Sequence, residues 1–143
     1  MTTVKQLLDI KGRNILSMSP NDSVYSAVER MSENNIGALL VIENGRLVGI
    51  LSERDYARKV ILKGKSSKNT LIREIMTPDV LCVSPETTVE ECMALLTENR
   101  VRHLPVMEGG KLTGIVSIGD LVKQIISDKD FTIQQLEHYI HSA

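Results

Sequence analysis

Hydrophobic residues recur with a helical period in two separate stretches of this chain. In the first, Val24, Ala27, Val28 and Met31 stand at positions i, i+3, i+4 and i+7, and the stretch 89–96 repeats that phase. A stripe of this kind lies on one face of an α-helix. The pattern therefore predicts two amphipathic helices, each of which buries one side.

Short signals ahead of each stripe predict where the helices begin. Ser23 and Thr88 directly precede the stripes and are predicted as N-caps, and Glu91 gives the second helix the spacing of a capping box. A short strand is predicted before each helix, over Ile15–Met18 and over Val80–Val83. A Ser-Pro dipeptide ends each of these strands.

A hairpin is predicted after each helix. The Asn44-Gly45 pair favours a type I′ turn, because both central residues of that turn need a positive φ, and a Gly-Gly pair occupies the matching place later in the chain. Leu39–Ile42 is apolar without alternation, which predicts a strand covered on both faces. A second helix is then predicted after Ser52 and after Ser117.

The two stretches belong to an internal repeat. Leu16–Tyr56 aligns with Leu81–Leu121 without a gap. About 15 of the roughly 41 aligned pairs are identical, which is more than a third, whereas chance would make about 6% of them identical. The chain therefore contains two copies of one structural unit.

The repeat predicts the organisation of the whole chain. The predicted segments are a first repeat with a leading helix at 1–64, a linker at 65–69, a second repeat with its own leading helix at 70–127, and a C-terminal helix at 128–143. The leading helices are expected over Val4–Ile10 and Thr70–Met76. The C-terminal helix is expected over Phe131–His141, with Phe131, Leu136 and Tyr139 or Ile140 available for docking.

Composition argues against several classes of protein. The 143 residues carry a net charge of −1 and 3% aromatic residues, unlike a nucleic-acid binder with a basic surface and stacking platform. No apolar run reaches the ~20 residues of a membrane span, and the N-terminus lacks a secretory signal pattern. Cys82 and Cys92 form no CxxC motif, which favours reduced thiols. We expect a cytoplasmic protein with no nucleic-acid or membrane partner and no metal.

One motif occurs at the end of the second hairpin strand in both repeats. Gly49–Asp55 and Gly114–Asp120 both have the form G-h-h-S-x-x-D, where h is apolar. On one interpretation the serine caps the next helix and the aspartate complements the helix dipole. On the other, the helix N-terminus attracts a phosphate and the aspartate accepts hydrogen bonds from two ribose hydroxyls. The two are compatible, because one aspartate can cap the empty protein and hold ribose when a ligand binds.

These features together resemble a pair of CBS domains. The resemblance rests on the order of the predicted elements and on Ser19-Pro20, Ser84-Pro85, Asn44-Gly45, Gly109-Gly110, the two G-h-h-S-x-x-D segments and Ile75-Met76-Thr77-Pro78. It covers roughly Ile10–Ser127 and implies an α/β (α+β) fold of two tandem β-α-β-β-α repeats packed about a pseudo-twofold axis. The chain resembles the small stand-alone prokaryotic CBS-pair proteins.

The resemblance implies adenosine-containing ligands in clefts between the two repeats. AMP is expected first, with ATP, ADP, NAD(H) and S-adenosylmethionine as alternatives. Carried over by motif, Asp55 and Asp120 would hold the ribose, and Ser52 and Ser117 would lie beside ribose or phosphate. The residues expected to frame the adenine are Met18, Ser19, Ala38, Leu39, Leu40, Val83, Ser84, Leu104 and Pro105.

The two repeats differ in charge near these motifs. Arg54 and Arg58 belong to or follow the first motif, whereas Arg102 and His103 open a buried strand of the second repeat. We assign all four to phosphate or ribose binding, with solvated surface as the alternative for Arg58. A pseudo-twofold packing would bring Arg102 and His103 toward Arg54. One cleft would then take a polyphosphate or dinucleotide, and the other a monophosphate or nothing.

Three functions fit the sequence. The first is a non-catalytic regulatory module that binds adenosine-containing ligands and signals by conformational change to an unidentified effector protein. The alternative is a dimerisation or scaffold module with vestigial sites. An enzyme is the third, disfavoured because no serine has a histidine base in the same motif. A homodimer is also expected, with Val60, Ile61, Ile125 and Ile126 as candidate contacts.

Overall fold

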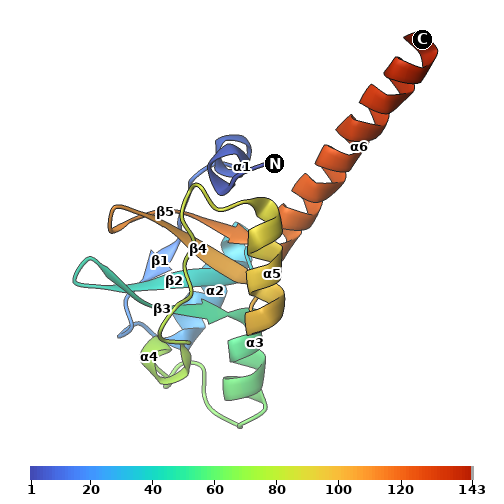
Figure 1. The fold of residues 1–143 in the computed structure, drawn as a ribbon. Coiled ribbons are helices and arrows are strands. Elements are labelled where there is room, and N and C mark those ends of the chain that lie inside the picture. The colour runs from blue at the N-terminus through green and yellow to red at the C-terminus, as the bar shows by residue number, and fades with distance from the viewer. Residues whose placement is uncertain (143) are drawn as a thin grey trace. The chain divides into compact units, whose positions relative to one another are not determined.

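The computed structural model describes the backbone of residues 1–142 and the side chains of residues 1–140. It divides the chain into two compact units, whose elements are labelled in Figure 1. One, which we call the continuous unit, is Asn14–Leu81. The other, which we call the split unit, combines Met1–Arg13 with the chain from Cys82 onward.

The continuous unit contains a three-stranded sheet. Its elements are β1 (Ser17–Met18), α2 (Val24–Asn34), β2 (Ala38–Glu43), β3 (Arg46–Ser52), α3 (Glu53–Tyr56), a π-helical segment η1 (Ala57–Ile61) and α4 (Ile72–Ile75). The strand order is β1-β2-β3, with β1 parallel to β2 and β2 antiparallel to β3. The mixed α/β character of the fold agrees with the sequence prediction.

The core of the continuous unit is built from the predicted stripe and the predicted strand. Val24, Ala27 and Met31 of α2 pack with apolar side chains of β2 and β3. Ile72 and Ile75 of α4 join the same core and are at most 1% exposed. The segment after the linker is therefore part of this unit.

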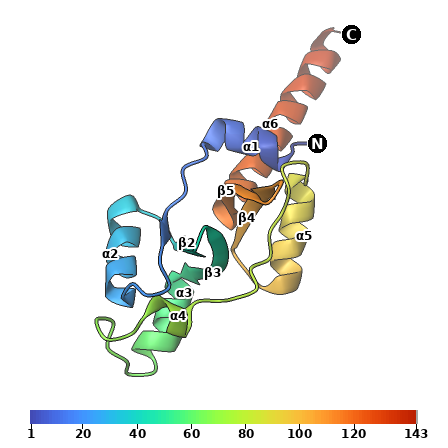
Figure 2. The same cartoon turned by 90° about the vertical axis from the view of Figure 1, so that its left-hand side faces the viewer.

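The split unit is built around one hairpin. Its elements are α1 (Val4–Lys11), α5 (Val89–Asn99), β4 (His103–Glu108), β5 (Lys111–Ser117) and α6 (Ile118–Ser142). Figure 2 shows α2 and α5 as separate helices, each within its own unit. The strand predicted over Val80–Val83 is reduced to one isolated parallel bridge, between Val83 and Val106.

Local backbone signals in the sequence set the predicted turns and caps. The Ser23 side chain accepts the Ser26 N–H, and Thr88 forms a capping box with Glu91. The turn between β2 and β3 has φ of 53° at Asn44 and 77° at Gly45. Because both angles are positive, the turn has the backbone that the Asn-Gly pair predicts.

The leading helices are exchanged between the sequence repeats. The Val4 N–H of α1 donates to the Thr87 carbonyl at 2.8 Å, which joins α1 to the second repeat. The Ile72 N–H of α4 donates to the Asp22 carbonyl at 2.9 Å, which joins α4 to the first. The boundaries at 1–64 and 70–127 describe repeats along the chain, whereas each spatial unit takes the leading helix that precedes the other repeat.

The C-terminal helix is a continuation of the last helix of the second repeat. The sequence predicted a separate helix over Phe131–His141, but α6 runs unbroken from Ile118. No proline or glycine after Gly119 interrupts it. The predicted segment at 128–143 ends at Ala143, which lies outside the described residues. Among the described helices, none is both long enough and apolar enough to cross a bilayer.

Candidate functional site

The first G-h-h-S-x-x-D motif lies where β3 of the continuous unit passes into α3. Ser52 and Asp55 form a reciprocal capping box: the Asp55 N–H donates to Ser52 Oγ at 3.2 Å, and the Ser52 N–H donates to Asp55 Oδ2 at 3.0 Å. The Glu53 N–H donates to the Gly37 carbonyl at 3.0 Å. Among the described residues, only the Arg54 N–H of this first turn lacks a protein acceptor. This junction therefore offers fewer free N–H groups to a phosphate than the sequence predicted.

The second oxygen of Asp55 also has protein partners. Lys59 Nζ lies 3.2 Å from Oδ1, and the Thr77 hydroxyl donates to the same oxygen at 3.5 Å. The Asp55 side chain is only 14% exposed. A ribose would have to replace these contacts before it could bind this carboxylate.

The second motif lies where β5 of the split unit passes into α6. The Ser117 N–H donates to Asp120 Oδ2 at 2.9 Å, and the Asp120 N–H donates to Ser117 Oγ at 3.1 Å. Lys11 Nζ reaches in from α1 and lies 2.6 Å from Asp120 Oδ2 and 2.5 Å from the Ile115 carbonyl oxygen. Within the described part of the chain, no hydrogen bond or ion pair reaches Asp120 Oδ1. The two motifs therefore differ in how much of the carboxylate is free.

The surroundings of Asp120 shift the pKa of two groups. Burial alone would raise the pKa of Asp120, but the hydrogen bonds from Lys11 and Ser117 outweigh it, and the net pKa is lowered. The pKa of His103 is lowered first by burial and then by the positive charge of Lys11, with Asp120 acting in the opposite direction. His103 is therefore an uncharged imidazole at pH 7, which can hydrogen-bond to a ligand but adds no positive charge.

In the continuous unit, β2 places its predicted adenine residues beside the junction. Ala38 is the register partner of Ser52 across the β2–β3 ladder. Leu39 belongs to the unit's core. Leu40 points to the opposite face of the strand, because side chains alternate. Met18 pairs with β2 through Val41, and Ser19 follows it directly.

In the split unit, β4 has the matching relation to its junction. His103 is the register partner of Ser117, and the Ile118 N–H donates to the Arg102 carbonyl at 2.9 Å. Leu104 and Pro105 are buried in β4. Two further predicted residues lie beside this strand or near it: the Val83 N–H donates to the Pro105 carbonyl at 3.0 Å, and the exposed Ser84 follows Val83.

The predicted cations divide between the units. Arg54 is partly buried and Arg58 is exposed in the continuous unit, whereas Arg102 is exposed in the split unit. The convergence of Arg102 and His103 with Arg54 stays a prediction. Across the described side chains, no group of three or more His, Cys, Asp or Glu is arranged to hold a metal ion.

Lys11 is a site residue that the sequence analysis did not identify. It belongs to the leading helix of the first repeat but contacts the aspartate of the second. No spacing rule joins two residues so far apart in the chain. Lys59 was not identified either, although its i+4 spacing from Asp55 is that of a helical ion pair.

One of the predicted dimer contacts is wrong. Val60 is 1% exposed and belongs to the core of the continuous unit, so it cannot meet another molecule. Its neighbour Ile61 is 58% exposed and Ile126 is 55% exposed. Ile125 is partly buried.

Known proteins match this chain over nearly its full length. The family model described as "CBS domain" matches twice, at residues 7–62 and 72–127. The mitochondrial CBS domain-containing protein CBSX3 of Arabidopsis thaliana is 40% identical over 99% of this chain and 73% of its own length.

Two solved structures show the same architecture. A protein of Burkholderia ambifaria with CBS domains, assigned to signal transduction, is 54% identical with a TM-score of 0.86, covering 89% of this chain and 96% of that one. A CBS-domain protein of Agrobacterium tumefaciens is 38% identical with a TM-score of 0.83, covering 86% of this chain and 98% of that one. The likeness therefore extends to both repeats.

Proposed function

This chain belongs to the CBS domain family, and from that premise we propose that it is a non-catalytic regulatory module that binds adenosine-containing ligands. The observation that carries the proposal is the pair of aspartates, Asp55 and Asp120. Each is the third residue of a helix that directly follows a strand, and each is fixed by the N–H of the preceding serine. A scaffold has no need of the same part-exposed carboxylate twice.

A carboxylate in this position suits the 2′,3′-diol of a ribose. The two hydroxyls can both donate to one carboxylate, and hydrogen bonds to a charged acceptor are the stronger kind. Asp120 can accept them with the least rearrangement, because its Oδ1 has no partner among the described residues. Asp55 must first release Lys59 and Thr77. We therefore propose that the split-unit site fills first.

Positive side chains near each motif support a phosphorylated ligand. Lys11 lies at Asp120, and Arg102 is close enough to His103 to lower its pKa. Arg54 and Arg58 follow Ser52 in the continuous unit. AMP is the smallest ligand with this chemistry, and ATP, ADP or NAD(H) would engage more of the cations.

The expected affinity suits a metabolite sensor. A nucleotide of ~23 heavy atoms at ~0.3 kcal/mol per atom would gain about 7 kcal/mol, which corresponds to a Kd near 10 μM. A ligand shifts a conformational equilibrium only if it binds one state better than the other. We propose that an effector protein reads the resulting change.

Isothermal titration calorimetry with AMP, ATP and NADH tests the proposal. Asp120→Asn and Asp55→Asn keep a capping oxygen but lose the charge, and each is expected to weaken binding at its own site by tenfold to about a hundredfold. Glu91→Gln is the matched control, because Glu91 is also a capping-box carboxylate at the third residue of a helix. It should bind like the wild type.

The results also separate the alternatives. If both aspartate variants bind all three ligands as the wild type does, the proposal is wrong. If the wild type binds none of them, and none raises its unfolding temperature, the scaffold function is favoured. Release of phosphate or of nicotinamide during the titration would indicate an enzyme instead.

A further inference from the structure

Beyond its first turns, α6 carries an apolar stripe with a regular spacing. Val122, Ile126, Lys129, Ile133, Leu136 and Ile140, which we call the α6 seam, succeed one another in alternating steps of four and three residues. Every apolar member of the seam is exposed, from 41% at Val122 to 69% at Ile140. Five apolar side chains on one stripe are thus open to solvent.

Alternating steps of four and three residues are the pattern of a coiled coil. Their mean of 3.5 residues keeps one stripe facing a partner helix along its whole length. At the base of the seam, Val122 and Ile126 form an open, mainly apolar face together with Ile118, Gly119 and Lys123 of the same helix. The seam therefore begins on a surface against which a second helix can pack.

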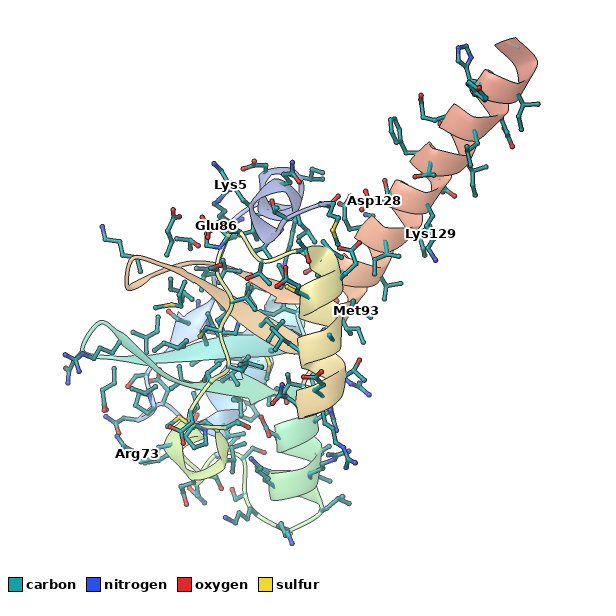
Figure 3. All side chains as sticks on the ribbon, viewed as in Figure 1. Lys5, Arg73, Glu86, Met93, Asp128 and Lys129 are labelled. Carbon is teal, nitrogen blue, oxygen red and sulfur yellow. The ribbon has the colours of Figure 1, made fainter. Side chains whose placement is uncertain are left out.

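The seam lies on a different side of α6 from the side that packs on the split unit. Leu121 is fully buried, and Asp128 accepts a hydrogen bond from the Thr2 hydroxyl at 2.9 Å. These contacts hold the helix up to Asp128, beyond which it extends from the unit (Figure 3). A partner would pack against a helix that is already formed, so the free energy of pairing need not offset the cost of helix nucleation.

We propose that α6 pairs with the α6 of a second copy of this chain as an antiparallel two-helix coiled coil. An antiparallel pairing of the full seam puts Val122 opposite Ile140, Ile126 opposite Leu136, and Lys129 opposite Ile133 of the other molecule. Every layer then contains at least one branched apolar side chain. The seam is complementary to itself, which is why a second copy is the occupant.

Charge decides the orientation of the two helices. A parallel pair would place Lys129 against its own copy, and like charges in the seam repel each other. In the antiparallel pair the Lys129 stem can cover Ile133 while its ammonium reaches water. The antiparallel pair also brings Lys123, on one flank of the seam, close to Glu137 on the same flank of the other molecule, twice by symmetry.

The same charges argue against a membrane surface as the occupant. From Lys123 onward, α6 carries Lys123 and Lys129 against Asp128, Asp130 and Glu137. Helices that lie on membranes are rich in Lys and Arg on their polar face. A helix with more acidic than basic residues is repelled by an anionic lipid surface.

Sedimentation equilibrium of the full chain tests the pairing. The wild type is expected to be a dimer at micromolar concentration, and Leu136→Asp to weaken dimerisation by roughly a hundredfold or more, because it buries an unpaired carboxylate against Ile126 of the other molecule. Phe131→Asp is the matched control. Phe131 is 63% exposed on the side of α6 away from the seam, so this variant should remain a dimer.

A charge exchange tests the orientation. Lys123→Glu should weaken the dimer several-fold, and the double variant Lys123→Glu/Glu137→Lys should restore it. A parallel pair would bring neither residue to the other, so it would show no rescue. Far-UV circular dichroism and unchanged nucleotide titrations would confirm that Leu136→Asp folds, and would keep this test separate from that of ligand binding.

Several outcomes would overturn the proposal. A monomeric wild type, a dimer that survives Leu136→Asp, or equal loss of the dimer in Phe131→Asp would each show that the seam does not pair. Absence of rescue would reject the antiparallel arrangement. Co-sedimentation of a monomeric wild type with phosphatidylcholine–phosphatidylserine vesicles, abolished by Leu136→Asp, would assign the seam to a membrane.

Discussion

Two glycines near the split-unit motif differ in what surrounds them. A Cβ on Gly114 would lie 2.8 Å from Leu8 Cδ1, whereas a Cβ on Gly119 would meet nothing closer than Ser117 Oγ at 3.7 Å. Gly114→Ala is expected to destabilise the protein by about 1–3 kcal/mol through overpacking. Gly119→Ala should stabilise it by up to about 1 kcal/mol, because alanine favours the helix. Urea unfolding measures both, and destabilisations of equal size would contradict the local geometry.

The ion pair between Lys11 and Asp120 predicts a specific dependence on pH. The folded pKa of Asp120 lies below its unfolded value of about 3.9, so the stability it contributes is complete above that value and is lost as pH falls through the folded pKa. The part-exposed pair is worth about 0.5–1 kcal/mol. Lys11→Met should therefore be less stable than the wild type at pH 7.

The dependence of unfolding free energy on pH in the acid range tests this ion pair. As the pH falls from 5 toward 2, the difference in urea-unfolding free energy between the wild type and Lys11→Met should shrink, since Asp120 becomes protonated in both. Arg13→Met is the control. Its partner Asp9 is 56% exposed, so its effect should be small at every pH. A constant difference between the wild type and Lys11→Met would show that Lys11 acts by packing alone.

At the scale of elements, α1 is expected to stabilise the hairpin of the second repeat. Leu8 is 1% exposed and packs against Gly114 of β5, whereas Ile10 of the same helix is 77% exposed. Leu8→Ala should cost about 2–5 kcal/mol and Ile10→Ala less than about 0.5 kcal/mol. Hydrogen exchange should locate the loss in β5 rather than β3. Faster exchange in β3 alone would contradict the assignment of α1 to the split unit.

The sequence predicted elements well wherever the cause was local. The caps at Ser23 and Thr88 and the turn at Asn44 follow from hydrogen bonds and φ angles within a few residues. The strand over Val80–Val83 was overestimated, because a β ladder depends on a partner and only Val83 finds one. The exchange of α1 and α4 had no local signal, since their apolar residues would suit either repeat.

The same distinction between local and distant causes applies to the candidate site. The motif identified Asp120 and Ser117, because the residues of a capping box lie within a span of four positions in the sequence. Lys11 was missed because it reaches Asp120 only through the exchanged helix. The neutral state of His103 was also missed, since burial and a neighbouring cation set it and neither is visible in the spacing. Local chemistry was therefore predictable, and its electrostatic setting was not.

At the scale of the whole molecule, the exchange of leading helices predicts which fragment of the chain can fold. Fragment 14–81 holds every residue of the continuous unit's core, whereas fragment 1–64, the first repeat as the sequence delimits it, lacks Ile72 and Ile75. The two fragments are similar in length, so chain length does not decide between them. Losing two fully buried isoleucines forfeits several kcal/mol, which is a large share of the stability of so small a unit.

We therefore expect fragment 14–81 to show the more cooperative thermal unfolding and the better dispersed amide spectrum. Fragment 1–64 should be collapsed or unfolded, because the α1 residues it gains pack in the split unit and have no partner within it. Ile72→Ala/Ile75→Ala in fragment 14–81 is the matched control, since it removes the same side chains without changing the boundaries. If fragment 1–64 unfolds as cooperatively as fragment 14–81, each repeat folds with its own leading helix and the exchange is not what stabilises the units.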